Sequence, residues 1–131
     1  LEKGFNVIYG SAYNLFSEME SEHFGEHTNK KYEAAISCDL LVIDDLGVER
    51  DTGFAKEQVF NIIDSRYRSG LPMIITTNLS MQKLATESDL SDKRVYDRII
   101  ERCFPVEVSG ESRRVKKLIS SREEMKNLLG I

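Results

Sequence analysis

The residues best suited to chemistry are two adjacent carboxylates, Asp44 and Asp45, at the end of the apolar run 40–43. Such a run, without polar alternation, is typical of a parallel strand covered on both faces, and ligands bind beyond the carboxyl ends of such strands. Mg²⁺ prefers oxygen ligands, and one carboxylate suffices where phosphates supply the rest. One acid can then hold Mg²⁺ while its neighbour reaches an attacking water. The alternative is an ordinary turn in which Asp45 acts as a cap.

Asn78 is the second candidate, because it ends the next apolar segment, residues 72–77. In a parallel sheet its amide would lie near Asp45 and could orient a water or a phosphate oxygen. An Asn after a strand is also a common turn former, so its position one strand after the acidic pair is the reason for choosing it.

Arginines form the third candidate group, because Arg94, Arg98 and Arg102 recur every four residues on one predicted helix face. One interpretation is a solvated face with ion pairs to Asp97 and Glu101. The other is an arginine that reaches the nucleotide of a neighbouring subunit and stabilises charge on a transferring phosphoryl group.

Charge and composition limit the class of protein. The 131 residues are 40% hydrophobic and 31% charged, which suits one globular domain with a core. The net charge is −4, with four basic and ten acidic side chains in residues 1–50. The whole molecule is therefore no basic nucleic-acid coat, although residues 91–131 carry ten basic and seven acidic side chains.

Neither a membrane nor a disulfide scaffold is indicated. No stretch approaches the roughly 18 apolar residues of a membrane span. Cys38 and Cys103 lie far apart in no metal-binding spacing, so we expect two buried thiols and a cytoplasmic location.

Strands and helices alternate along the chain, which predicts an α/β fold with a mainly parallel sheet. Strands are predicted at residues 5–10, 40–44, 72–78 and 106–109, and helices at 12–24, around 32–36, at 55–69, 79–84, 91–103 and near 121–128. Predicted helix caps are Ser11, Ser91 and a Ser121–Glu124 capping box, and Gly70 is expected to end the helix at 55–69.

Together these motifs resemble the DnaC/DnaI-type bacterial helicase loaders and the related IstB-like ATP-binding proteins, both AAA+ ATPases. The similarity covers nearly the whole chain, from "LEKGFNVIYGSAYNLF" through "DLLVIDDLG" and "IITTNLS" to "KRVYDRI" and "GESRR". The "VYDRI" helix favours the loaders over the transposition helpers. The resemblance implies that residues 1–131 form the C-terminal part of one AAA+ core, a three-layer αβα P-loop NTPase-like domain.

The family also implies roles for the two acids and the asparagine. Asp44 resembles the Walker B acid that holds Mg²⁺, and Asp45 stands where the family places the acid that polarises the attacking water. Asn78 matches the sensor-1 asparagine.

The arginines match two further positions of the family. Arg98 resembles the arginine finger, with Arg94 as a second candidate. Arg114 matches the sensor-2 arginine that contacts the nucleotide, with Arg113 one step out of register.

One motif of the family is absent from these 131 residues, namely the phosphate loop G-x-x-x-x-G-K-[ST]. Its expected place precedes "LEKGF", so the simplest account is that this chain is the C-terminal part of a longer ATPase. Without the loop we expect very weak phosphate binding, and no hydrolysis of ATP by this polypeptide alone.

The missing loop carries a strand with it, which affects the sheet. In the family's strand order, 5-1-4-3-2, the first strand lies between the strands at 72–78 and 106–109. Its absence leaves a slot of roughly 9–10 Å with exposed edges. We therefore expect residues 105–109 to be displaced, to pair directly with the strand at 72–78, or to leave the slot to another chain.

The function implied is an ATP-dependent loader that places a hexameric replicative helicase on DNA. ATP and Mg²⁺ are the expected cofactors, and the chain is expected to oligomerise on binding ATP. The helicase and single-stranded DNA are the expected partners, and no membrane is involved. The alternatives are an IstB-like transposition helper and a non-catalytic adaptor with a degenerate nucleotide-binding fold.

Overall fold

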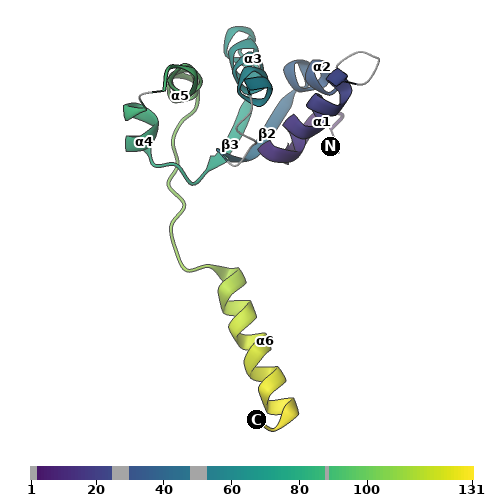
Figure 1. Ribbon diagram of the computed structural model, residues 1–131, viewed down its shortest axis with the longest axis vertical. Coiled ribbons are helices and arrows are strands. Elements are labelled where there is room, and N and C mark those ends of the chain that lie inside the picture. The colour runs from purple at the N-terminus through teal and green to yellow at the C-terminus, as the bar shows by residue number, and fades with distance from the viewer. Residues whose placement is uncertain (1–2, 25–29, 48–52, 88) are drawn as a thin grey trace.

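Three parallel strands form the sheet of this protein, seen here in a computed structural model that describes residues 3–24, 30–47, 53–87 and 89–131. They are β1 (Val7–Ser11), β2 (Leu40–Leu46) and β3 (Met73–Thr77), in the order β1-β2-β3 (Figure 1). Because each strand pairs with the next one along the chain, all three carboxyl ends lie at one rim of the sheet.

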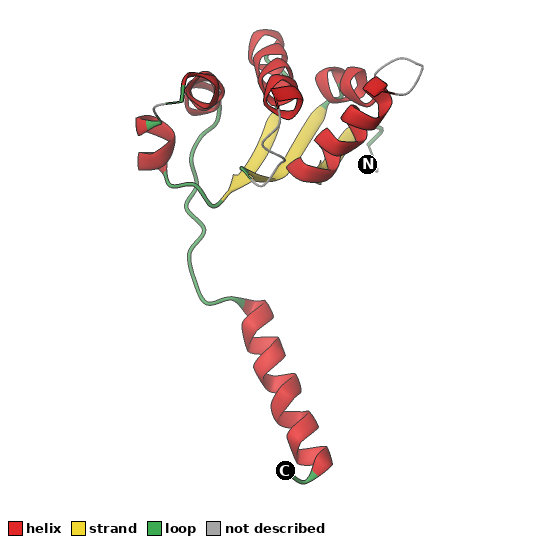
Figure 2. Cartoon of the chain, viewed as in Figure 1, coloured by secondary structure: helices red, strands yellow, loops and turns green. Residues whose placement is uncertain are grey.

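Helices connect and follow the strands (Figure 2). They are α1 (Ala12–Phe24), α2 (Lys30–Ser37), α3 (Gly53–Ser69), α4 (Met81–Thr86), α5 (Leu90–Arg102) and α6 (Arg113–Leu129). Both crossovers, β1 to β2 and β2 to β3, step in the same direction across the sheet. Right-handed crossovers therefore place α1, α2 and α3 on one face.

The core lies between this sheet face and the helices. Leu41 and Ile43 of β2 are buried there, and α1 contributes Leu15, Phe16 and Met19 to the same cluster, as predicted. The described helices leave the other face open, because Tyr9 is 69% and Ile74 is 52% exposed. The α/β class and the parallel sheet are confirmed. Of the three layers expected, the described residues form two, the sheet and the helices on one of its faces.

Two helix boundaries follow the predicted signals. The hydroxyl of Ser11 accepts a hydrogen bond from the Asn14 amide at 3.2 Å and so caps α1. Helix α3 ends before Gly70, whose positive φ of 71° gives the left-handed conformation of a C-cap.

Two other predicted caps are wrong. Helix α5 already begins at Leu90, because the carboxylate of Asp89 accepts from the Asp92 amide at 3.2 Å, so Ser91 lies inside the first turn. The last helix begins at Arg113 with Ser112 as its cap. No Gly or Pro interrupts residues 113–129, so the helix runs straight through the predicted capping box, and the hydroxyl of Ser121 donates to the Lys117 carbonyl at 2.9 Å.

The strand predicted at residues 106–109 does not form. Val106 and Val108 are 75% and 92% exposed, and the segment has no regular structure. A groove of about 480 Å³ separates it from β3, bounded by residues 70–75 on one side and by residues 102–104 and Val106 on the other. A strand needs a neighbour for its hydrogen bonds, so no strand forms at this separation. The segment is displaced, which is one of the three expected outcomes.

Helix α6 stands apart from the body of the protein (Figure 1). None of its residues is buried, and Val115, Leu118 and Ile119 are each more than half exposed.

Arg66 is the most unusual core residue, because its side chain is fully buried. Its guanidinium donates to the carbonyl oxygens of Ala35 and Cys38 at 2.9 Å and of Pro72 at 2.5 Å. These carbonyls belong to α2, to the turn before β2 and to the start of β3. Arg66 of α3 therefore ties together the segments that set where β2 and β3 begin.

Replacing Arg66 by Met should destabilise the fold, because the change keeps the apolar volume but leaves the Ala35 and Cys38 carbonyls without this donor. We expect a loss of about 3 kcal/mol in the free energy of unfolding, measured by urea denaturation. Arg68→Met on the same helix is the control, because Arg68 is exposed and its guanidinium makes one ion pair among the described residues, with Asp64. It should change stability by less than about 1 kcal/mol. Equal effects of the two substitutions would contradict this role of Arg66.

Candidate functional site

The end of β2 carries an irregularity that shapes the site. Ile43 pairs with Ile75 and Leu46 with Thr77, so β2 contains one more residue than β3 between these two pairs. This is the geometry of a β-bulge. Asp45 lies in it with a positive φ of 55°, the only such value for a non-glycine residue in the described chain.

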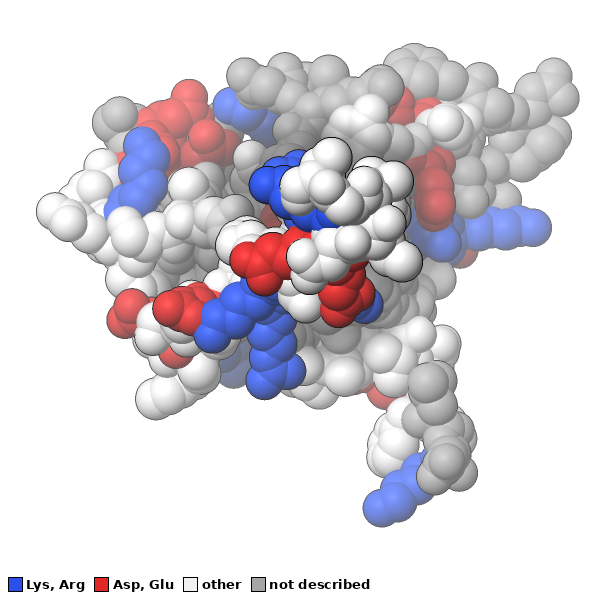
Figure 3. All heavy atoms as spheres, turned by 90° about the horizontal axis from the view of Figure 1, so that it is seen from below, with Lys and Arg blue, Asp and Glu red and all other residues white. Residues whose placement is uncertain are grey.

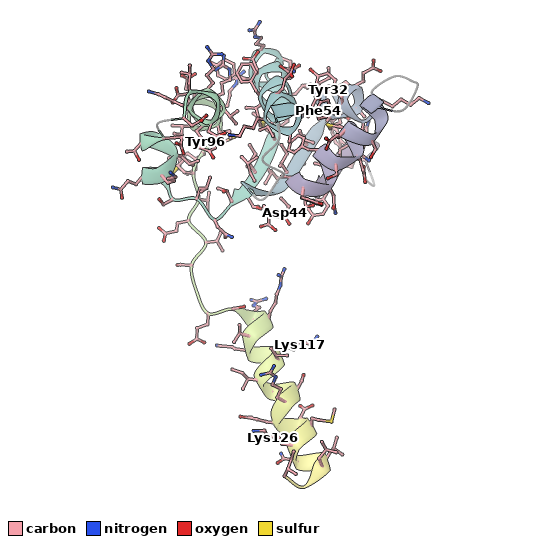
Figure 4. All side chains as sticks on the ribbon, in the orientation of Figure 1. Tyr32, Asp44, Phe54, Tyr96, Lys117 and Lys126 are labelled. Carbon is pink, nitrogen blue, oxygen red and sulfur yellow. The ribbon has the colours of Figure 1, made fainter. Side chains whose placement is uncertain are left out.

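Asp44 is half-buried at the rim and accepts two hydrogen bonds from neighbouring strands. The Thr76 hydroxyl of β3 donates to Oδ1, and the Tyr9 hydroxyl of β1 donates to Oδ2 at 3.3 Å. Figure 4 shows Asp44 at the lower edge of the sheet, on the side away from α3. The predicted metal ligand therefore lies at the rim where parallel sheets bind ligands.

Hydroxyl groups of β3 also hold the backbone of the bulge. The Asp45 amide donates to the Thr76 hydroxyl at 3.0 Å, while the carboxylate of Asp45 is exposed. The Thr77 hydroxyl donates to the Leu46 carbonyl at 2.7 Å and accepts from the Leu79 amide at 3.1 Å.

Asn78 follows Thr77 directly and is exposed. Because Thr77 pairs with Leu46, Asn78 lies beside the end of β2. The structure thus brings Asp44, Asp45 and Asn78 to one rim, as the sequence predicted.

The three regularly spaced arginines have different surroundings. Arg98 lies between α5 and α3, where its Nε contacts Asp64 at 2.5 Å and its guanidinium lies 5.1 Å from the Phe60 ring centroid. Arg102 donates to the Tyr67 carbonyl at 3.0 Å. The side chain of Arg94 is exposed and makes no ion pair within the part of the chain that the structure describes.

Arg113 and Arg114 are exposed on the first turn of α6. Because α6 stands apart from the sheet (Figure 1), the structure does not bring them to Asp44. The nucleotide-contacting role expected of Arg114 stays a prediction.

Sequence reasoning missed Tyr9 and Thr76 as members of the site. A signal for Thr76 was present in its position within "TTN", two residues before Asn78. Tyr9 lies opposite Val42, two residues before Asp44 and on the same sheet face. This relation depends on the strand register, which the sequence pattern did not fix.

The site can be tested for its fit to Mg²⁺. Among the described residues, no group of three or more His, Cys, Asp or Glu is arranged to hold a metal ion. A half-buried carboxylate beside an exposed one instead suits a cation that takes few protein ligands and keeps its waters or phosphate oxygens. Asp44 and Asp45 therefore fit Mg²⁺ that arrives with a nucleotide, but not an ion held by protein ligands alone.

Comparison with protein-family models identifies the chain. Residues 1–121 match the model of the IstB-like ATP binding proteins. The chain belongs to this ATP-binding family. No curated protein matches the sequence. In the described part of the chain, no helix combines the length and apolar character needed to cross a bilayer.

Solved structures show where the fold recurs. The chain is similar to DnaA from Aquifex aeolicus bound to AMPPCP, with a TM-score of 0.66 at 24% identity over 96% of this chain and 38% of that one. It is also similar to DnaI, with a TM-score of 0.62 at 25% identity over 73% of this chain and 54% of that one. The DnaC helicase loader is similar with a TM-score of 0.60 at 26% identity, over 77% of this chain and 60% of that one. The chain thus spans less than two thirds of each of these AAA+ proteins.

Tyr9 offers a pH-dependent test of the site geometry. The negative charge of Asp44 and the hydrogen bond to it raise the pKa of the Tyr9 phenol above 10.0. The protonated phenol therefore stabilises the folded state below pH 10, and this contribution is lost as the pH rises through the raised pKa. Asp44→Asn should lower the Tyr9 pKa toward its ordinary value, as measured by NMR titration of the ring carbon. An unchanged pKa would contradict the contact.

Proposed function

We propose that this chain supplies the metal-binding and water-orienting side of an ATP site in an AAA+ ATPase that loads a replicative helicase. The observation that carries the proposal is the meeting of Asp44, Asp45 and Asn78 at one sheet rim in a member of an ATP-binding family. The phosphates would be held mainly by a glycine-rich loop, which these 131 residues do not contain.

Each residue at the rim has a distinct task in the proposed mechanism. Asp44 would hold Mg²⁺, which neutralises charge on the phosphates when it is bound. The exposed carboxylate of Asp45 would accept a proton from the attacking water and orient it. The amide of Asn78 would donate to a phosphate oxygen or fix the same water.

An arginine from a neighbouring subunit would complete the site. The first candidate, Arg98, is engaged by Asp64 and the Phe60 ring within its own chain. Arg94 lies one helical turn earlier and is exposed, so its guanidinium is available to a second copy. We therefore favour Arg94 for the contact in trans and assign Arg98 to the packing of α5 on α3.

The proposed partners are a hexameric replicative helicase and single-stranded DNA, in the cytoplasm. Similarity to DnaI and to the DnaC helicase loader supports the helicase, and a structure of DnaA bound to single-stranded DNA supports the nucleic acid. On the face seen in Figure 3, basic and acidic side chains are interspersed among the described residues. We therefore expect any DNA contact there to be local rather than a continuous basic surface.

A transposition helper is the second candidate, because the matching family model is that of the IstB-like proteins. It would use the same ATP chemistry and differ in its partner. Binding of a purified replicative helicase, rather than of a transposase, distinguishes the two.

Asp45→Asn should abolish ATP turnover in the product of the complete gene, while ATP binding is retained. We expect a loss of about 100-fold or more in kcat, since this is the usual contribution of a general base. Turnover is measured as phosphate release and binding as the fluorescence of a labelled nucleotide.

Asp39→Asn is the matched control. Asp39 comes directly before the first residue of β2, at the end of the strand away from Asp45. Its carboxylate accepts a hydrogen bond from the Asn6 amide at 2.7 Å, which an asparagine side-chain oxygen can also do. The control should keep its turnover. Full turnover in the Asp45→Asn protein would remove Asp45 from the mechanism, and absence of ATP binding in the unsubstituted protein would support the adaptor.

Mixing two inactive proteins tests the arginine in trans. An Arg94→Ala protein keeps its own acids, and an Asp45→Asn protein keeps Arg94, so a mixture should recover turnover that neither has alone. Arg98→Ala should instead lower the free energy of unfolding, by about 1–2 kcal/mol, through loss of the Asp64 and aromatic contacts. Full turnover of the Arg94→Ala protein alone would contradict the assignment.

A further inference from the structure

We infer that Thr76 is a positioning residue whose single hydroxyl group holds both Asp44 and Asp45 in place, and that Tyr9 competes with the metal for Asp44. The inference rests on the proposed function, because it concerns how the rim holds the carboxylate that binds Mg²⁺. It assigns opposite effects on metal binding to Thr76 and Tyr9, which both contact the carboxylate of Asp44.

The hydrogen bonds of Thr76 are the first step of the argument. A hydroxyl has one proton and two lone pairs. It donates the proton to Oδ1 of Asp44, and a lone pair accepts the Asp45 amide at 3.0 Å. A single oxygen atom of β3 thus fixes the side chain of one acid and the backbone of the next.

The backbone of Asp45 shows why this second bond matters. Its φ of 55° lies in the left-handed region, which costs a residue other than glycine roughly 1–2 kcal/mol. The bond to Thr76 offsets part of that cost at the residue that forms the bulge. Without it, the bulge can relax, and the two carboxylates lose their fixed relation.

Tyr9 contacts the other oxygen of Asp44 and does so less firmly. Its bond to Oδ2 measures 3.3 Å, and its side chain is 69% exposed on the open face of the sheet. A metal ion, or a water bound to it, needs a lone pair of this carboxylate. Because the phenol is exposed, it can release Oδ2 when a metal binds, so the Tyr9 bond opposes metal binding. The Thr76 bond instead favours metal binding, because it holds the carboxylate in a fixed orientation.

Three substitutions separate these roles. Thr76→Val keeps the β-branched shape and removes the hydroxyl, while Thr76→Ser keeps the hydroxyl. Tyr9→Phe removes only the competing donor. Thr76 and Tyr9 are exposed, so we expect all three variants to fold, which their amide NMR spectra will verify.

The experiment measures broadening of amide NMR signals by Mn²⁺, which replaces Mg²⁺ at oxygen ligands. In the unsubstituted product of the complete gene, substoichiometric Mn²⁺ added with a non-hydrolysable ATP analogue should broaden the Asp44 and Asp45 amide signals, and Asp44→Asn should sharply weaken this. Thr76→Val should weaken the apparent affinity about tenfold and speed hydrogen exchange of the Asp45 amide, since a hydrogen bond to a charged group is lost. Thr76→Ser should keep the metal affinity and the Asp45 amide exchange of the unsubstituted protein. Tyr9→Phe should strengthen metal binding about threefold.

The outcomes distinguish this inference from the proposed function. Absence of broadening at Asp44 in the unsubstituted, nucleotide-bound protein would remove the metal site and this inference with it. Binding that persists unchanged in Thr76→Val, or a Thr76→Ser variant as weak as Thr76→Val, would overturn the role of Thr76 and leave the metal site standing. Weaker binding in Tyr9→Phe would overturn the competing role of Tyr9.

Discussion

The extra residue at the end of β2 is the constraint on which the site depends. A regular strand would send Asp44 and Asp45 to opposite faces, one of them toward the helices and the core. The bulge instead leaves Asp44 at the rim of the open face and Asp45 exposed, while Leu46 returns to the core. Two adjacent acids can thus both reach the ligand side of the sheet without burying an unpaired charge, whose cost would be several kcal/mol.

The rest of the fold keeps that rim in place. The parallel register aligns the carboxyl ends of all three strands, and buried Arg66 fixes the segments at which β2 and β3 begin. Because the described helices pack on one face of the sheet only, Asp44 and its partners Tyr9 and Thr76 lie on the open face. The chain therefore presents an ordered set of acids and hydrogen-bond donors at this rim, where we propose that the nucleotide of this ATP-binding family binds.

Local patterns predicted much of this arrangement, and contacts between segments account for the rest. Apolar runs located all three observed strands, and the parallel order then placed the acids and the asparagine at one rim. Periodicity alone did not show that Arg98 packs against Asp64, 34 residues earlier in the chain. The bonds of Tyr9 and Thr76 depend on register and on the bulge, which no short pattern encodes. The strand expected at 106–109 does not form, because a groove lies between this segment and the unpaired edge of β3.

The most direct test is a crystal structure of the complete gene product with Mn²⁺ and a non-hydrolysable ATP analogue, in which anomalous scattering locates the metal. The account predicts a single strong metal peak at the rim of the sheet, bound by Asp44 directly or through one water, with the terminal phosphate on the side of Asp45 and Asn78. A metal and nucleotide bound away from this rim, with Asp44 still held only by Thr76 and Tyr9, would contradict it.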